Sequence, residues 1–233
     1  MERNDLTTHR REFLSSLATG AVAMSMASIV APLQSMAQAP QNSTHENDPD
    51  PEAWFKKVKG RHRIVFDVTE PHEIFPFAWP RIFLATNEMT GTMEKDATAV
   101  VILRHNAIPF AMEDRLWDKY KLGEFFKITD PATKSPSVRN PFWQPKEGDF
   151  KVPGLGNVAI GINELQNSGV MFCACNMAIT VYSAVLAQGM NLNPDDVKKD
   201  FIAGILPGIQ VVPSGVWAVG RAQEHGCAYC FVG

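Results

Sequence analysis

The sequence predicts an α/β protein built around a parallel five-stranded sheet. Runs rich in β-branched and aromatic residues alternate with stretches whose apolar residues recur at helical spacing. These runs are apolar on both faces, as strands buried in a parallel sheet are. Alternation of such strands with helices is typical of a parallel α/β sheet. The predicted strands cover residues 63–69, 97–104, 170–175, 209–213 and 227–232.

Helices are predicted between these strands, and Pro80 is tolerated only near the start of one. Gly169 and Gly226 each follow a predicted helix and precede a strand, which is typical of helix C-terminal glycines. The segment 121–153 contains five prolines and shows neither the helical nor the strand periodicity of apolar residues. It is therefore expected to be a loop insertion, anchored by the packing of Phe142 and Trp143. The predicted helices cover residues 79–90, 112–120, 157–167, 176–188, 194–202 and 216–225.

The N-terminus has the pattern of a twin-arginine export signal, residues 1–37. Arg10 and Arg11 precede a weakly apolar run, residues 14–31, and Ser35-Met36-Ala37 forms a small-x-small cleavage site. The protein is therefore expected to be exported already folded, to the periplasm or beyond. The alternative is a basic amphipathic helix with a chance arginine pair. Residues 38–60 are polar and rich in Pro, Asn and Asp, so they are expected to form a flexible linker to the domain, residues 61–233.

Composition excludes several classes of partner. The formal net charge of −3 is the same after removal of residues 1–37, which carry three charges of each sign, so nothing indicates nucleic-acid binding. No segment after the signal approaches the ~20 apolar residues of a membrane span. The sequence Gly154-Leu155-Gly156 with Ala159 fits a dinucleotide fingerprint, but no strand precedes it, so nucleotide binding is not expected.

Three segments resemble the DsrE/DsrF-like sulfur-relay family: residues 169–178, 208–216 and 221–229, together with the first strand, residues 64–69. The resemblance extends over residues 61–231, and the sequence around 139–143 is similar to an exported subgroup. It implies a three-layer α/β/α sandwich, strand order 4-3-2-1-5 and a homo-oligomer, commonly a trimer or hexamer. That order places residues 104–106 beside residues 175–176, at the carboxyl ends of the strands where α/β proteins bind ligands.

Cys175 is the first candidate site residue, because it lies where a strand meets a helix N-terminus, a position that stabilises a thiolate. It is expected to accept sulfane sulfur as a persulfide or to attack a disulfide, with His105 as proton acceptor or positive neighbour. The partner would be a sulfur donor or acceptor protein or a small thiol, without a tightly bound organic cofactor. Alternatively, Cys175 is a buried apolar residue.

Cys173 is expected on the same strand face as Cys175, with Cα atoms ~6.5–7 Å apart, at the limit of disulfide geometry. A redox or resolving role and simple burial both stay open for it. Cys227 and Cys230 form a C-x-x-C pattern, but in a strand they face opposite sides, ~10 Å apart. They would suit zinc or an iron–sulfur cluster only in a turn. The alternative function is therefore a non-catalytic oligomeric binding protein with structural or metal-holding cysteines.

Overall fold

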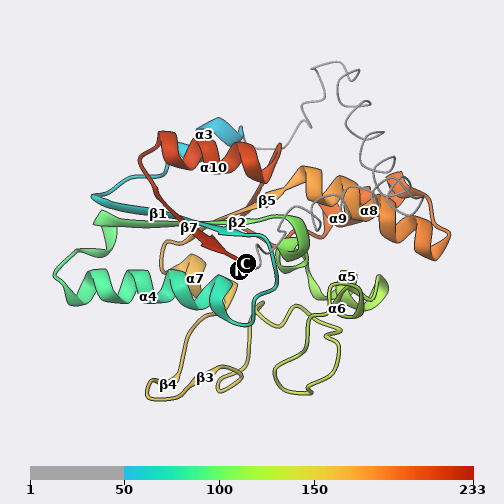
Figure 1. The fold of residues 1–233 in the computed structure, drawn as a ribbon, viewed down its shortest axis with the longest axis horizontal. Coiled ribbons are helices and arrows are strands. Elements are labelled where there is room, and N and C mark those ends of the chain that lie inside the picture. The colour runs from blue at the N-terminus through green and yellow to red at the C-terminus, as the bar shows by residue number, and fades with distance from the viewer. Residues whose placement is uncertain (1–49) are drawn as a thin grey trace, which may run out of the picture. The chain divides into compact units, whose positions relative to one another are not determined.

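A computed structural model describes residues 50–233, and the expected signal peptide and most of the expected linker lie outside them. The strands form one parallel sheet in the order β6-β5-β2-β1-β7 (Figure 1). In chain order this is 4-3-2-1-5, so the α/β class and the expected strand order are confirmed. The strands are β1 (His62–Val68), β2 (Ala97–Leu103), β5 (Met171–Cys175), β6 (Ile209–Val212) and β7 (Ala228–Val232).

Helices cover both faces of this sheet and give the three layers (Figure 1). On one face lie α3 (Pro51–Phe55) and α10 (Gly215–Glu224); on the other lie α4 (Phe75–Met89) and α7 (Ile162–Asn167). Side chains of β2 alternate between two apolar clusters, with Val100 and Ile102 in one and Val101 and Leu103 in the other. Because successive side chains of a strand point to opposite faces, an almost entirely apolar strand is buried only when helices cover both faces of the sheet.

The remaining helices are short except for the pair that connects β5 to β6. This pair is α8 (Asn176–Met190) and α9 (Pro194–Ala203), which pack against each other. A 3₁₀ segment (His105–Ala111), α5 (Asp114–Lys119) and α6 (Leu122–Phe125) follow β2. Within the described residues no helix is long and apolar enough to cross a membrane.

The expected linker is wrong in its last part. Residues 51–55 form α3, with Asp50 as its N-cap and Pro51 in its first turn. Trp54, Phe55 and Val58 are buried beneath α10. Burial of two aromatic rings outweighs the polar composition of the surrounding sequence, so the domain begins about ten residues earlier than expected.

Two helix starts also differ from the sequence prediction. Helix α4 begins at Phe75, so Pro80 lies in its second turn and not near its start. Pro80 is buried there, and tertiary packing compensates for its missing hydrogen bond. Helix α7 begins at Ile162, because Gly156 and Asn157 form β4, which pairs with β3 (Lys151–Val152). The glycine pattern is thus a hairpin and not a strand-to-helix turn.

The insertion, residues 121–153, is built into the domain. Asn140 is fully buried and donates to the carbonyl oxygens of Phe110 and Met112. Phe142 is buried and stacks on Phe150 with ring centroids 4.7 Å apart, which confirms its role as a packing anchor. Side-chain amides and aromatic rings therefore hold a segment that has little secondary structure.

Candidate functional site

The candidate site lies at the carboxyl edge of the sheet, where β2 and β5 end side by side. Leu103 is paired with Ala174, so Arg104 and Cys175 are the next residues on two neighbouring strands. The expected adjacency of residues 104–106 and 175–176 is therefore present. The chain turns into α8 directly after Cys175 and into a 3₁₀ segment directly after Arg104.

Cys175 is the N-cap of α8. Its Sγ accepts a hydrogen bond from the Ala178 N–H at 3.3 Å, and the helix that follows has 15 residues. The residue is 6% exposed and unpaired with any other cysteine. The thiol therefore has a polar environment at one side and an apolar one at the other.

Arg104 is at this edge, as the predicted strand order implies, but the sequence pattern assigned it no role. Its Nε and Nη2 donate to the two carboxylate oxygens of Asp67 at 2.6 and 2.9 Å, and the Tyr229 hydroxyl donates to Asp67 Oδ2 at 2.8 Å. The hydrogen bond to Asp67 raises the pKa of Arg104 above its usual range. Asp67 lies on β1, which is on the side of β2 away from β5. Asp67, an acidic residue inside the apolar run Ile64–Val68, was the sequence feature that could have indicated a buried cationic partner.

His105 is at the same edge, but its polar contact is with Glu70. Its Nδ1 lies 3.1 Å from Glu70 Oε1, while Asn106 donates to Glu70 Oε2 at 2.8 Å. The Tyr182 hydroxyl donates in turn to Asn106. His105 has φ +50°, a left-handed conformation that non-glycine residues adopt rarely. His105 therefore lies at the carboxyl edge in a separate hydrogen-bonded group with Glu70, Asn106 and Tyr182.

Cys173 is fully buried, and the expectation that it shares a face with Cys175 is wrong in terms of packing. Cys173 belongs to the apolar cluster beneath α10, whereas Cys175 belongs to the cluster on the other side of the sheet. The reason is that β5 ends at Cys175, where the chain bends into α8 and the strand alternation stops. Burial raises the pKa of the Cys173 thiol far above its usual range.

Cys227 and Cys230 lie on opposite sides of the sheet, as expected for a strand. Cys227 precedes β7 and packs beneath α10, while Cys230 packs against the other cluster. Burial raises the pKa of Cys227 to about 11 and also raises that of Cys230. Within residues 50–233 no group of three or more His, Cys, Asp or Glu side chains is placed to hold a metal ion.

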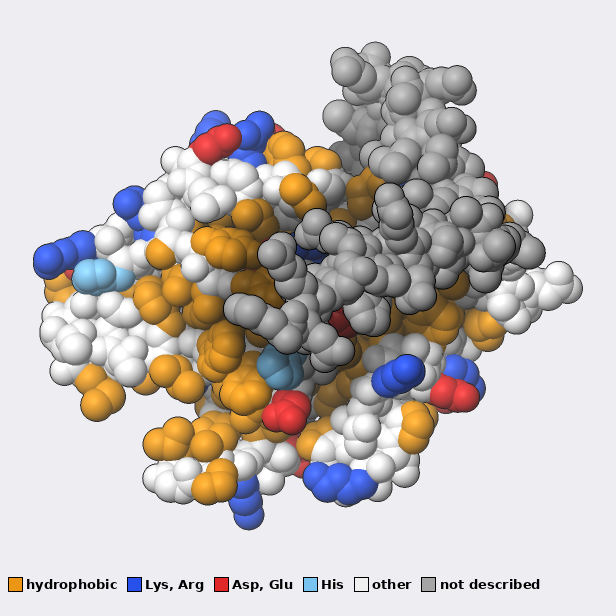
Figure 2. Space-filling model, viewed as in Figure 1, with side chains coloured by type: hydrophobic (Ala, Val, Ile, Leu, Met, Phe, Trp, Pro, Cys, Tyr) orange, Lys and Arg blue, Asp and Glu red, His pale blue; other side chains and the backbone are white. Residues whose placement is uncertain are grey.

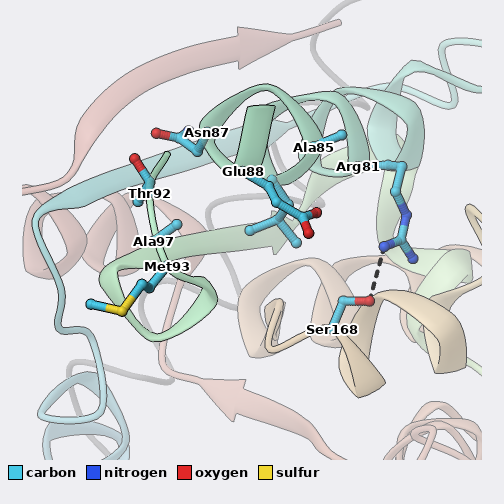
Figure 3. A pocket seen from close by; sticks show the side chains of 9 residues that line it. Arg81, Ala85, Asn87, Glu88, Thr92, Met93, Ala97 and Ser168 are labelled. Atoms are coloured by element: carbon cyan, nitrogen blue, oxygen red, sulfur yellow. Dashed lines mark hydrogen bonds between the residues drawn. The ribbon is translucent and has the colours of Figure 1, made fainter. Parts of the chain in front are cut away.

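Two cavities of about 490 Å³ lie at opposite edges of the sheet. One is bordered by α4 and by Ala97, the first residue of β2 (Figure 3). There Arg81 reaches across to Ser168 at 2.9 Å and to the Ala159 carbonyl, so its guanidinium joins α4 to the segment around α7. The other cavity is at the carboxyl edge and is lined by Glu70, His72, Asn106, Phe125, Phe126 and Lys127.

Charged side chains are dispersed over the face shown in Figure 2. Lys and Arg side chains lie at separate places around its rim, and hydrophobic side chains occupy much of the visible area between them. The visible part of this face therefore has no continuous basic stripe of the kind that follows a nucleic-acid backbone.

Fold and site together define a parallel α/β protein with a cysteine at a helix N-terminus. No family model matches the sequence, and no curated protein matches it. Among solved structures, it is similar to a protein of unknown function, MTH1491 from Methanobacterium thermoautotrophicum, with 19% identity and a TM-score of 0.37. That alignment covers 73% of this chain and 99% of the other. It gives no information on function.

Proposed function

We propose that this is an exported sulfur-handling protein that resembles the DsrE/DsrF-like family and carries or relays sulfur through Cys175. The observation that carries the proposal is the place of its Sγ, at the N-cap of α8 and bonded to the Ala178 N–H. Sulfur transfer requires a thiolate, and a helix N-terminus is a feature that favours one.

The proposed step transfers one neutral sulfur atom and needs no external oxidant. The Cys175 thiolate attacks the outer sulfur of a persulfide donor, R–S–SH. A new S–S bond forms to Cys175, the donor S–S bond breaks, and the donor leaves as the thiolate R–S⁻. The product is Cys175–S–SH, which passes its outer sulfur to an acceptor thiol in the same way.

The surroundings of Cys175 limit what can reach it. With 6% of the residue exposed, a donor sulfur must approach along the carboxyl edge of the sheet. A small thiol or a flexible cysteine-bearing segment of a partner protein fits this restriction better than a bulky ligand. We further propose that the protein acts after export through the twin-arginine route and assembles as a trimer or hexamer. The twin-arginine signal, residues 1–37, lies outside the described residues.

The test is persulfide formation followed cysteine by cysteine. Purified protein is incubated with a sulfane-sulfur donor, digested and examined by mass spectrometry. We expect the mass of one added sulfur atom on Cys175. Cys175→Ser should abolish the product, whereas Cys230→Ser, which removes the most exposed of the four thiols, should retain it. Sulfur on Cys230 alone, or on no cysteine, would contradict the proposal.

The alternative is a non-catalytic binding protein in which the cysteines are structural. One observation favours it: Cys175 is part of an apolar cluster as well as a helix cap. A structural thiol would resist both sulfane donors and small alkylating reagents in the folded protein. In that case Cys175 would react only after denaturation, which the same mass-spectrometric comparison detects.

A further inference from the structure

Arg81 and Glu88 both line the cavity at the amino edge of the sheet, which has a volume of about 490 Å³. They lie seven residues apart on α4, which is about 10.5 Å along the helix axis. Figure 3 shows the Glu88 carboxylate extended from α4 toward the side on which the Arg81 guanidinium lies. Within residues 50–233 neither side chain forms an ion pair. The cavity therefore holds two opposite charges that do not neutralise each other by contact.

The guanidinium of Arg81 is held by uncharged acceptors. Its Nε donates to the Ala159 carbonyl and its Nη1 donates to Ser168 Oγ at 2.9 Å, which leaves Nη2 without an acceptor among the described residues. Burial lowers the pKa of Arg81, because partial removal from water disfavours its charge. Glu164 acts on it electrostatically, but the Glu164 carboxylate accepts from the Gly161 N–H. The cation is thus fixed in place with donors left for an anion.

A role in joining α4 to the segment around α7 accounts for only part of this arrangement. Hydrogen bonds to a carbonyl and a hydroxyl need no positive charge, and a charge partly withdrawn from water without a counter-ion costs free energy. Glu88 is exposed, and its carboxylate accepts no hydrogen bond from the described part of the chain. A ligand that pairs with both side chains accounts for the two charges together.

We propose that this cavity binds a free α-amino acid, with its carboxylate on Arg81 and its ammonium group on Glu88. At neutral pH an α-amino acid carries these two charges on adjacent groups, so it fits between a cation and an anion that do not reach each other. Its volume is in the range of small-molecule sites. The inference is independent of sulfur transfer, because Cys175 ends β5 at the carboxyl edge, whereas this cavity borders Ala97 at the start of β2.

The apolar residues of the cavity indicate which kind of amino acid it takes. Leu84 and Ala85 follow Arg81 by three and four residues, so they lie on the same helix face between the two charges. Met93, from the segment between α4 and β2, and Ala97 also line the cavity. Among the described residues no third charged side chain lines it. An amino acid with an apolar side chain, such as leucine, therefore leaves no charge of its own unpaired.

The experiment is isothermal titration calorimetry of the purified protein with three matched probes. They are L-leucine, 4-methylpentanoate, which lacks the amino group, and 3-methylbutylamine, which lacks the carboxylate. We expect L-leucine to bind at least roughly tenfold more tightly than either analogue, since each analogue loses one charge-assisted contact. Absence of L-leucine binding, or binding no tighter than that of 4-methylpentanoate, would overturn the inference.

Two charge-removing variants assign the ends of the ligand. Glu88→Gln should weaken L-leucine binding by roughly tenfold and leave 4-methylpentanoate unaffected, because only the ammonium group loses its partner. Arg81→Gln should weaken the binding of both acids. The matched controls are Lys199→Gln and Asp196→Asn, which remove one charge each from an exposed pair on α9 and should change neither affinity. Wild-type L-leucine binding by Glu88→Gln would overturn the assigned site.

A third variant fills the cavity and keeps both charges. Ala85→Trp places a large side chain at an exposed position of α4 and should abolish L-leucine binding, so the test stands even if Arg81→Gln does not fold. Circular dichroism checks the fold of each variant. L-leucine binding retained by folded Ala85→Trp would overturn the inference. Cys175→Ser should bind L-leucine as the wild type does, which separates this site from the proposed sulfur carrier.

Discussion

His105 and Glu70 form a pair at the carboxyl edge, with His105 Nδ1 3.1 Å from Glu70 Oε1. Both side chains are about half exposed, so the pair itself adds little stability. Its effect is to orient the imidazole, because Glu70 is held in turn by Asn106. The sequence places His105 one residue from Arg104, and the structure gives these neighbours different partners.

The first prediction concerns the separate hydrogen-bond partners of Arg104 and His105. His105→Ala should leave the pH midpoint of Cys175 alkylation unchanged, since the imidazole is bonded to Glu70 and not to the thiol. Glu70→Gln should likewise have no effect. The measurement is the per-cysteine labelling profile. A midpoint that moves to higher pH in His105→Ala would show that the imidazole acts on the thiol and contradict the prediction.

The second prediction concerns alkaline stability. Burial raises the pKa of Cys227 from 9.0 to about 11, so between these values the unfolded chain loses a proton that the folded one keeps. Stability from this group is complete below pH 9 and is lost as the pH rises toward 11, by at most about 1.4 kcal/mol per pH unit. In urea titrations, Cys227→Ala should make the unfolding free energy fall less steeply between pH 9 and pH 11. Cys173 contributes with the same sign, so part of the slope should persist.

The third prediction concerns acid stability at Asp200. Burial opposes its ionisation, but hydrogen bonds from Lys119, Arg115 and Tyr120 outweigh burial and lower the pKa of Asp200 from 3.8 to about 2. The stabilisation is present above pH 3.8 and lost as the pH falls toward 2. Asp200→Asn should lower the unfolding free energy by about 1–2 kcal/mol near neutral pH. It should also remove this group's loss of stability between pH 3.8 and pH 2.

Its control is Asp118→Asn. Asp118 is 71% exposed and forms a single ion pair with Lys121, so its replacement should change the unfolding free energy hardly at all. Both variants are compared by chemical denaturation above and below the window. Equal stabilities of the Asp200 and Asp118 variants at neutral pH would contradict the assigned network.

The fourth prediction tests the packing of α3. Phe55 is fully buried, with its ring edge-to-face on Trp217 of α10 at 5.7 Å between centroids. Phe55→Ala should lower the unfolding free energy by about 3–5 kcal/mol, since it removes a buried ring and leaves a cavity. Phe125→Ala, at a side chain 41% exposed, should cost much less. Similar losses for the two variants would show that α3 does not belong to the core.

The strands were predictable because each is a largely apolar run; β2 and β5 are buried on both faces, whereas the edge strand β7 is mostly exposed. All five sequence ranges match β1, β2, β5, β6 and β7 to within one residue at each end. Gly169 and Gly226 have φ of +81° and +79°, so their predicted role at helix ends is confirmed. The predicted start of α4 is wrong because a proline lacks a backbone N–H and locally disfavours a helix interior. In the fold Pro80 is buried inside α4, and packing compensates for the missing hydrogen bond.

The site was predictable in part, for the same reason. Cys175 follows from the sequence because a strand-to-helix junction is a local feature. The pairing of Asp67 with Tyr229 joins residues 162 positions apart and has no local signature. Arg104 was adjacent to a predicted site residue, yet its direction depends on Asp67 in another strand.

The sequence by itself determined the succession of strands and helices and put a cysteine where β5 meets α8, because periodicity and helix capping act over a few residues. Tertiary structure alone decided which partners the residues after β2 have: Arg104 is bonded to Asp67, whereas His105 is paired with Glu70. The reason is physical: a buried carboxylate fixes a guanidinium, and the parallel pairing of β1 with β2 brought Asp67 within 3 Å of Arg104.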